Sequence, residues 1–318
     1  MRKIHSVLAL LLFIIPGFIQ ATTWNEPWAD KVIRESNSFV LAKVISSDEH
    51  EGIQIKILKQ LAGEQLPEEL KINDFKYVAV YKDKDVHGPE FHFENIDSCY
   101  FFIAKDSKGG YCFSTPTSGF DRVKDGQVFA TYRHSYHQAL VPVAIYEMTM
   151  TAIFNNYHQK EYDQKDINSF VKEQLSHKPA GFQESEINTF FKQHVALECV
   201  YHLKLEGYYN YILPFLNDTA NFHNQVSAAR ALVAYNTPEC KKELVSVISD
   251  TKRDIFLQVI CIWTLKEFKP TELKAELKKI LPTASEANNG FGGNIMDPRV
   301  GTHFPEVKDA LKDLIETL

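Results

Sequence analysis

The feature that most constrains the fold is a repeat of apolar residues between Leu197 and Leu281, which recur every 32 or 33 positions. Such a period is typical of stacked helical hairpins, because each hairpin can bury its apolar face only against its neighbours. Structures of this kind usually present a surface to a partner. The residues in register are Val200, Leu232 and Leu265; Leu203, Tyr235 and Phe268; Ile212, Leu244 and Leu277; Phe215, Val247 and Ile280; and Leu216, Ile248 and Leu281.

Helical periodicity also occurs before the repeat. Apolar spacing from Leu140 to Met150 predicts a long helix that ends near Tyr157, and a weaker pattern predicts a helix over 167–175. A linker-like segment covers 176–181, and breaks such as Gly207 and the two prolines at 238 and 270 separate the later helices. Those helices are predicted over 184–206, 208–217, 222–236, 239–249, 252–268, 271–282 and 305–317.

The last third of the chain resembles the short bacterial α-solenoids of the HEAT type. The register positions above carry this resemblance, together with the Ala-Ala-Arg-Ala-Leu pattern at 228–232 in the first helix of a repeat. The resemblance covers about 120 residues. It implies an architecture and says almost nothing about activity.

The half that follows residue 21 has the pattern of a β domain. Run 39–45 is strand-like, and run 53–58 alternates strictly between apolar and polar residues. Further strands are predicted over 77–81, 99–104, 111–114 and 128–132, with glycine- and proline-containing turns between them and one short helix over 28–36. Short strands in succession favour a small antiparallel barrel or sandwich.

This β half is similar to netrin-like modules, the OB-type barrel shared with tissue inhibitors of metalloproteinases. The similarity rests on three features: strand 38–45, strand 53–63 running into a Lys-x₃-Gly turn, and Cys99-Tyr-Phe-Phe-Ile followed by Cys112. In that family a mature N-terminal cysteine chelates the protease metal. Here the expected mature start is Thr22-Thr23-Trp24, so the inhibitor mechanism does not transfer.

Together these patterns predict an α+β chain with two domains. A small β domain is expected over 22–137, a helical connector over 138–182, and a HEAT-like repeat domain over 183–318. The preceding residues 1–21 have the pattern of a secretory signal peptide. Arg2 and Lys3 precede an apolar run over 7–15, which is too short for a membrane anchor and ends near Ala21.

Cleavage near Ala21 would place the protein in the periplasm or outside the cell, with no stable membrane insertion. It would remove Arg2 and Lys3 and no acid, so the net charge would change from −6 to −8. A mildly acidic chain with scattered charges argues against nucleic-acid binding, which needs a concentrated basic face.

Export would permit disulfides. Cys99 and Cys112 flank a turn-rich segment between two strand-like runs, so a bridge across a hairpin is expected. Cys199, Cys240 and Cys261 lie on apolar helix faces, where a thiol packs as a small hydrophobic group. With five cysteines, at least one thiol is left unpaired within the chain.

The most unusual segment is a glycine-rich loop over 288–303, which separates two helices and is longer than most connections. Such a loop either caps the last repeat, contacts a partner or ligand, or supplies catalytic groups. Its candidate binding residues are Phe291, Asn294, Asp297, Arg299 and His303. Its glycines match neither a phosphate loop nor a dinucleotide-binding fingerprint.

Other chemistry has little support in the sequence. His134 and His137 would lie together on a helical turn, but no third metal ligand is evident, so no metal and no cofactor are expected. The chain lacks the nucleophile elbow of hydrolases and the His-Glu-x-x-His helix of zinc proteases. The sequence therefore identifies no catalytic residue, and it leans against an enzyme without deciding the question.

The sequence favours an exported module that binds another protein. One alternative is an inhibitor or immunity-type protein that acts on a toxin or protease, with the β half as the contact surface. A hydrolase that uses Asp297, Arg299 and His303 is a further alternative.

Overall fold

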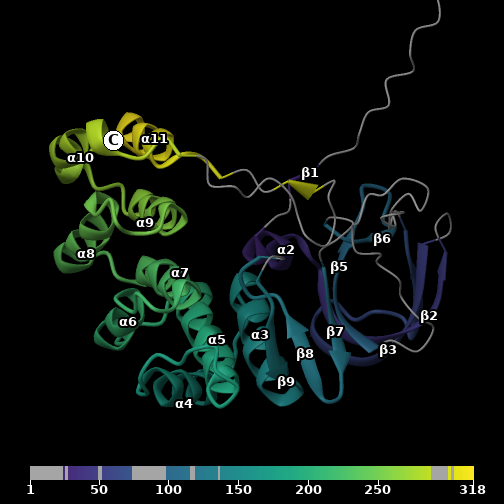
Figure 1. Cartoon of the computed structure of the whole chain (residues 1–318). Helices are drawn as coiled ribbons and strands as arrows, with labels where there is room; N and C mark the ends of the chain where they lie inside the picture. Colours follow the sequence, from purple (N-terminus) through teal and green to yellow (C-terminus); the bar gives the residue numbers. More distant parts are fainter. Residues whose placement is uncertain are drawn as a thin grey trace, which may run out of the picture.

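The computed structural model describes residues 24–25, 28–48, 52–73, 98–114, 119–134, 137–287, 300–301 and 304–318. The fold is α+β: a β-barrel with additional strands forms the N-terminal part, and helices form the C-terminal part (Figure 1). Within the described residues no helix is both long and apolar enough to cross a membrane.

Five strands close the barrel. The hydrogen-bonded order is β2-β3-β4-β6-β5, and β5 pairs back onto β2; β4 and β6 run parallel, and the other neighbours are antiparallel. The second edge of β5 pairs first with β7 and then with β6, and the sheet continues through β8 to β9. The strands are β2 (Ser38–Asp48), β3 (Gly52–Gly63), β4 (Glu69–Ile72), β5 (Ser98–Lys105), β6 (Tyr111–Cys112), β7 (Phe120–Lys124), β8 (Gln127–Ala130) and β9 (Ala139–Pro142).

Strand β5 is buried on both faces, which explains its continuous apolar sequence. Alternate residues Cys99, Phe101 and Ile103 belong to the apolar cluster inside the barrel. Tyr100 and Phe102 point the other way and belong to the large cluster that continues into the helices. The predicted alternation of β3 is also observed: Ile53 and Ile55 are fully buried, as a strand with one solvated face requires.

The helices pack in consecutive pairs. Contacts join α4 with α5, α6 with α7, α8 with α9, and α10 with α11, while α5 packs on α7, α7 on α9, and α9 on α11. Helix α3 packs on α5 and on β3, and α2 packs on α3, so these two helices connect the barrel to the rest (Figure 1). The helices are α2 (Ala29–Glu35), α3 (Val143–Tyr157), α4 (Gln164–Leu175), α5 (Ile187–Leu203), α6 (Tyr209–Leu216), α7 (Phe222–Ala231), α8 (Pro238–Ser249), α9 (Ile255–Glu267), α10 (Lys274–Ile280) and α11 (Val307–Thr317).

A buried glutamine occurs at the same register position in three successive pairs: Gln193, Gln225 and Gln258. Each side-chain amide donates to a carbonyl at or just after the end of the preceding helix. The acceptors lie 2.8 Å away at Lys178, 3.3 Å away at Leu216 and 2.8 Å away at Asp250. The last carbonyls of a helix lack partners within the helix, so these amides satisfy groups whose burial would otherwise be costly.

Most predicted helices are observed, with shifts of a few residues at their ends. The predicted helix beginning at Leu140 is a correction: residues 139–142 form strand β9, and α3 begins at Val143. Pro142 explains the change, because a residue before proline favours extended backbone and proline has no N–H for a helical hydrogen bond. Strand β9 extends the sheet beyond residue 137, and the predicted strand over 77–81 lies outside the described residues.

The structure contains no disulfide among the described residues, so the expected Cys99–Cys112 bridge is not formed. Cys112 pairs with Ala104 across β5 and β6, and Ala104 lies five residues along β5 from Cys99. At about 3.3 Å per residue, this offset is roughly twice the largest Cα separation of a disulfide. The other three cysteines are buried on helices, as expected.

Candidate functional site

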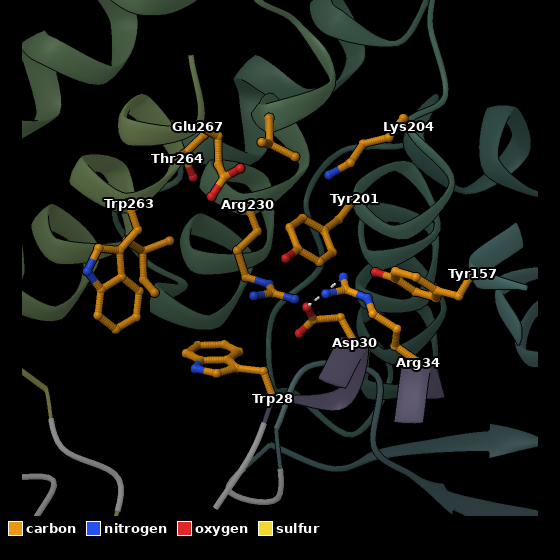
Figure 2. Close-up of a pocket in the computed structure, with 12 residues that line it drawn as sticks. Trp28, Asp30, Arg34, Tyr157, Tyr201, Lys204, Arg230, Trp263, Thr264 and Glu267 are labelled. Carbon is orange, nitrogen blue, oxygen red and sulfur yellow. Dashed lines mark hydrogen bonds and ion pairs between the residues drawn. The ribbon is translucent and has the colours of Figure 1, made fainter. Parts of the chain in front are cut away.

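An open pocket lies at the junction between α2 and the helices α3, α5, α7 and α9 (Figure 2). Its volume is about 500 Å³, a size that suits a small molecule or a few side chains of a partner. We call it the junction pocket. Its lining residues are Trp28, Asp30, Arg34, Tyr157, Tyr201, Lys204, Arg230, Val233, Ile260, Trp263, Thr264 and Glu267.

The short helix α2 brings the barrel side of the pocket into place. Val32 and Ile33 are buried in the core and hold α2 against the sheet. The N–H of Ala29 donates to the carbonyl of Arg133 at 2.9 Å, which fixes the start of the helix. Asp30 and Arg34, one turn apart, are thereby left on the pocket side, where they form an ion pair at 3.5 Å.

On the opposite side of the pocket, α7 and α9 each supply a wall residue from the same position of the repeat, and the equivalent residue of α5 is buried behind them. Glu198, Arg230 and Trp263 are separated by 32 and 33 residues, which is the repeat spacing. Both Nε and Nη2 of Arg230 donate to Oε2 of Glu198, at 3.3 and 3.2 Å. The guanidinium lies 4.7 Å from the ring centre of Trp28 and 3.8 Å from that of Tyr201, so two aromatic rings enclose it.

The Glu198–Arg230 pair is buried, with Glu198 fully inaccessible to solvent. Burial is the largest single influence and would lower the pKa of Arg230, but Glu198, Tyr201 and Asp30 together outweigh it and raise the pKa above its usual value. Removing one partner of such a pair costs about 3–5 kcal/mol, because the other charge is left buried. The pair and its two rings therefore join the helices to the barrel at this point.

Lys204 is a second cation over the same ring. Its Nζ lies 4.4 Å from the ring centre of Tyr201, and its backbone has φ of 52° at the end of α5. The residue as a whole is exposed, but its ammonium group points into the pocket (Figure 2). Burial of that group and the charge of Arg230 lower the pKa of Lys204 to about 8.

Tyr157 lines the pocket on the α3 side, and the buried His202 lies behind it. The hydroxyl of Tyr157 lies 2.8 Å from Nδ1 of His202, and Nε2 of His202 lies 2.7 Å from the carbonyl of Tyr132. A carbonyl only accepts, so Nε2 carries the proton and Nδ1 accepts from the hydroxyl. Burial lowers the pKa of His202 to about 3, so its 3.9 Å contact with Glu198 is not an ion pair at neutral pH.

A cluster of buried histidines lies beside this site. The ring of His137 is 4.2 Å from that of His194 and 4.6 Å from that of His223, and Nδ1 of His194 lies 2.9 Å from the hydroxyl of Ser227. Burial lowers the pKa of all three histidines. Within the described part of the chain, no three histidine, cysteine, aspartate or glutamate residues converge as a metal site would require.

The structure brings His134 to the junction as well, with its ring 4.8 Å from that of Trp28. The candidate loop residues Phe291, Asn294, Asp297, Arg299 and His303 lie outside the described residues. Phe304, at the end of that loop, is buried and packs 5.1 Å from Trp263 and 4.2 Å from Phe256. Strand β10 (Val300–Gly301) pairs in parallel with β1 (Trp24–Asn25).

Sequence reasoning missed the residues that line the junction pocket, although one signal was present. Glu198 and Arg230 are charged residues inside apolar helical runs, and their separation equals the repeat spacing. Two opposite charges at one register position of adjacent repeats must face each other once the repeats stack. The pattern therefore predicts a buried pair, but nothing in it places Trp28 beside that pair.

No protein-family model, curated protein or solved structure matches this chain. The function must therefore be inferred from the junction pocket and its surroundings.

Proposed function

We propose that this chain is an exported binding protein that recognises another protein at the junction pocket. The observation that carries the proposal is the combination of an open pocket with tryptophan, tyrosine and arginine side chains in its walls. These three residue types dominate the energetics of protein–protein interfaces. The two tryptophans, Trp28 and Trp263, are only partly buried by the rest of the chain, so aromatic surface remains for a ligand.

The paired packing of α4 to α11 supports the further proposal that the helical part is a HEAT-like solenoid. The glutamines in register, each serving the preceding helix, support it as well. The barrel order β2-β3-β4-β6-β5, with β4 and β6 parallel, supports an OB-type barrel of the netrin-like kind. Export rests on the signal-peptide pattern of residues 1–21.

The test is capture of partners from the exported fraction of the native cell, with the full chain as bait. Wild type is compared with Trp263→Ala, which removes an aromatic wall, and with Val233→Phe, which fills the pocket. Phe182→Ala is the matched control, because Phe182 is an exposed aromatic residue that does not line the pocket.

A partner that binds wild type and the control, but neither folded pocket variant, would support the proposal. Affinity of that purified partner, measured by calorimetry, should fall by at least tenfold in both pocket variants, since truncation of a central aromatic residue usually costs over 1.4 kcal/mol. Equal binding of all four proteins would refute the assignment of the pocket.

A further inference from the structure

The basic side chains of the junction pocket have more hydrogen-bond donors than its acidic side chains occupy at close range. Arg230 uses Nε and Nη2 for Glu198, and its Nη1 makes no hydrogen bond within the described part of the chain. The Nζ of Lys204 has neither a hydrogen bond nor an ion pair with any described residue. Two cations with unused donors therefore approach the ring of Tyr201.

The two cations repel each other. The charge of Arg230 is the second-largest cause, after burial, of the lowered pKa of Lys204. Asp30 and Glu267 act in the opposite direction, but the net shift is still downward. Asp30 is already paired with Arg34, and Glu267 is exposed on the last turn of α9. An additional negative group close to both Lys204 and Arg230 would relieve this repulsion.

Two hydroxyl groups in the pocket are already used by the protein itself. The hydroxyl of Thr264 donates to the carbonyl of Ala229 at 3.0 Å, and that of Tyr157 contacts His202. The wall beyond the cations is apolar and includes Trp263, Val233 and Ile260. A ligand that fits these walls has a compact anionic group at one end and an apolar or aromatic group at the other.

From this arrangement we infer that the junction pocket binds a carboxylate group, held by Lys204 and Arg230, with the apolar part of the ligand against Trp263. This inference deepens the proposed function and rests on the same pocket. The carboxylate can belong to the C-terminus of a protein, to an acidic side chain, or to a free organic acid. All three have the same chemistry at Lys204 and Arg230.

The first experiment uses 3-indolepropanoate and its neutral amide as probes, titrated into the full chain and followed by ligand-observed NMR. The acid should bind and the amide should bind at least about tenfold more weakly, because the amide cannot accept the charge-assisted hydrogen bonds of Lys204 and Arg230. Lys204→Met should weaken binding of the acid by a similar factor, whereas Glu267→Gln should strengthen it. Lys172→Met is the control, because Lys172 is exposed on α4 and outside the pocket.

Two peptides then distinguish the sources of the carboxylate. One ends in tryptophan with a free C-terminal carboxylate, and the other has an internal Trp-Glu pair and an amidated C-terminus. Preference for the first identifies a chain terminus, preference for the second identifies an acidic side chain, and binding of indolepropanoate alone identifies a free acid. Each result supports a carboxylate site.

Equal binding of the acid and the amide, or no effect of Lys204→Met, would overturn the inference. So would a failure of every carboxylate probe to bind at millimolar concentration. If the pocket variants of the capture experiment still lose their protein partner in that case, the proposed function stands and only the carboxylate is wrong. If those variants also retain the partner, both proposals fail.

Discussion

Acidification is expected to destabilise the folded protein, because burial holds several histidines neutral at the junction. His202 gives the magnitude. Both of its ring nitrogens are hydrogen-bonded in the neutral form, and burial lowers its pKa to about 3. In the unfolded chain the pKa of a histidine is about 6.5, so the unfolded state binds the proton more tightly.

The sign follows from this difference. The contribution of His202 to stability is complete above pH of about 6.5 and is lost as the pH falls toward 3. By proton linkage, His202 alone lowers the free energy of unfolding by about 2 kcal/mol at pH 5 relative to pH 7.5. Burial lowers the pKa of four further histidines in the same direction, namely His134, His137, His194 and His223.

Asp121 opposes this effect. Its carboxylate accepts from the hydroxyl of Tyr146 at 2.5 Å, but burial dominates and raises its pKa to about 6. A raised carboxyl pKa means that folding is favoured as the pH falls toward 3.8, and the gain between pH 7.5 and pH 5 is about 1.5 kcal/mol. This gain is smaller than the loss from His202 alone, so the histidines determine the sign.

The assay is urea denaturation at pH 7.5, 6 and 5, followed by tryptophan fluorescence and circular dichroism. The free energy of unfolding should fall at each step, and His202→Gln should reduce the dependence on pH because glutamine does not titrate. His177→Gln, at an exposed position, should leave it unchanged. Stability that is constant or rises from pH 7.5 to pH 5 would refute the reasoning.

Three further predictions concern stability measured by chemical denaturation. Gly52→Ala should cost well over 1 kcal/mol, because Gly52 has φ of +86° and a Cβ would lie 2.2 Å from a backbone oxygen. Gly126→Ala should cost about 1 kcal/mol, because Gly126 has φ of +73° but open space around its Cα. Equal losses of stability in the two variants would contradict the steric argument. Gln258→Leu should cost about 1–3 kcal/mol, since it leaves carbonyls at the end of α8 unpaired, and an unchanged midpoint would exclude that role. Arg230→Met should cost about 3–5 kcal/mol by isolating Glu198, and adding Glu198→Met should recover part of the loss; no recovery in the double variant would argue against coupling of the pair.

The main elements of the fold could be predicted from periodicity, and the exceptions have physical reasons. Strands such as β3 show alternation because one face is solvated, and the helices show apolar spacing for the same reason. Strand β9 was assigned to a helix, because its four residues continue into the apolar pattern of α3 and only Pro142 marks the change. Strands β4 and β7 were missed because four or five residues carry too little pattern.

The candidate site was less predictable, because it depends on contacts between distant segments. The repeat spacing links Glu198 to Arg230, but Trp28 reaches them only through the way α2 packs on the sheet. The bridge expected between Cys99 and Cys112 was wrong for the same reason. Both strands exist, but closure of the barrel sets the register that separates the two cysteines. Local sequence contains no information about that closure.

The large apolar cluster includes residues of α2, of the outer face of β5, of α3 and of each helix from α4 to α11. The outer face of the barrel and the helices therefore share one interior, separate from the cluster inside the barrel. A chain cut at residue 137 would lose the ring contacts of Phe39 with Phe154 and of Tyr100 with Tyr146, and a chain cut at 182 would lose that of Tyr157 with His202. We therefore expect neither part to fold stably as a separate module, and a substitution on either side of the junction must be compatible with the other side.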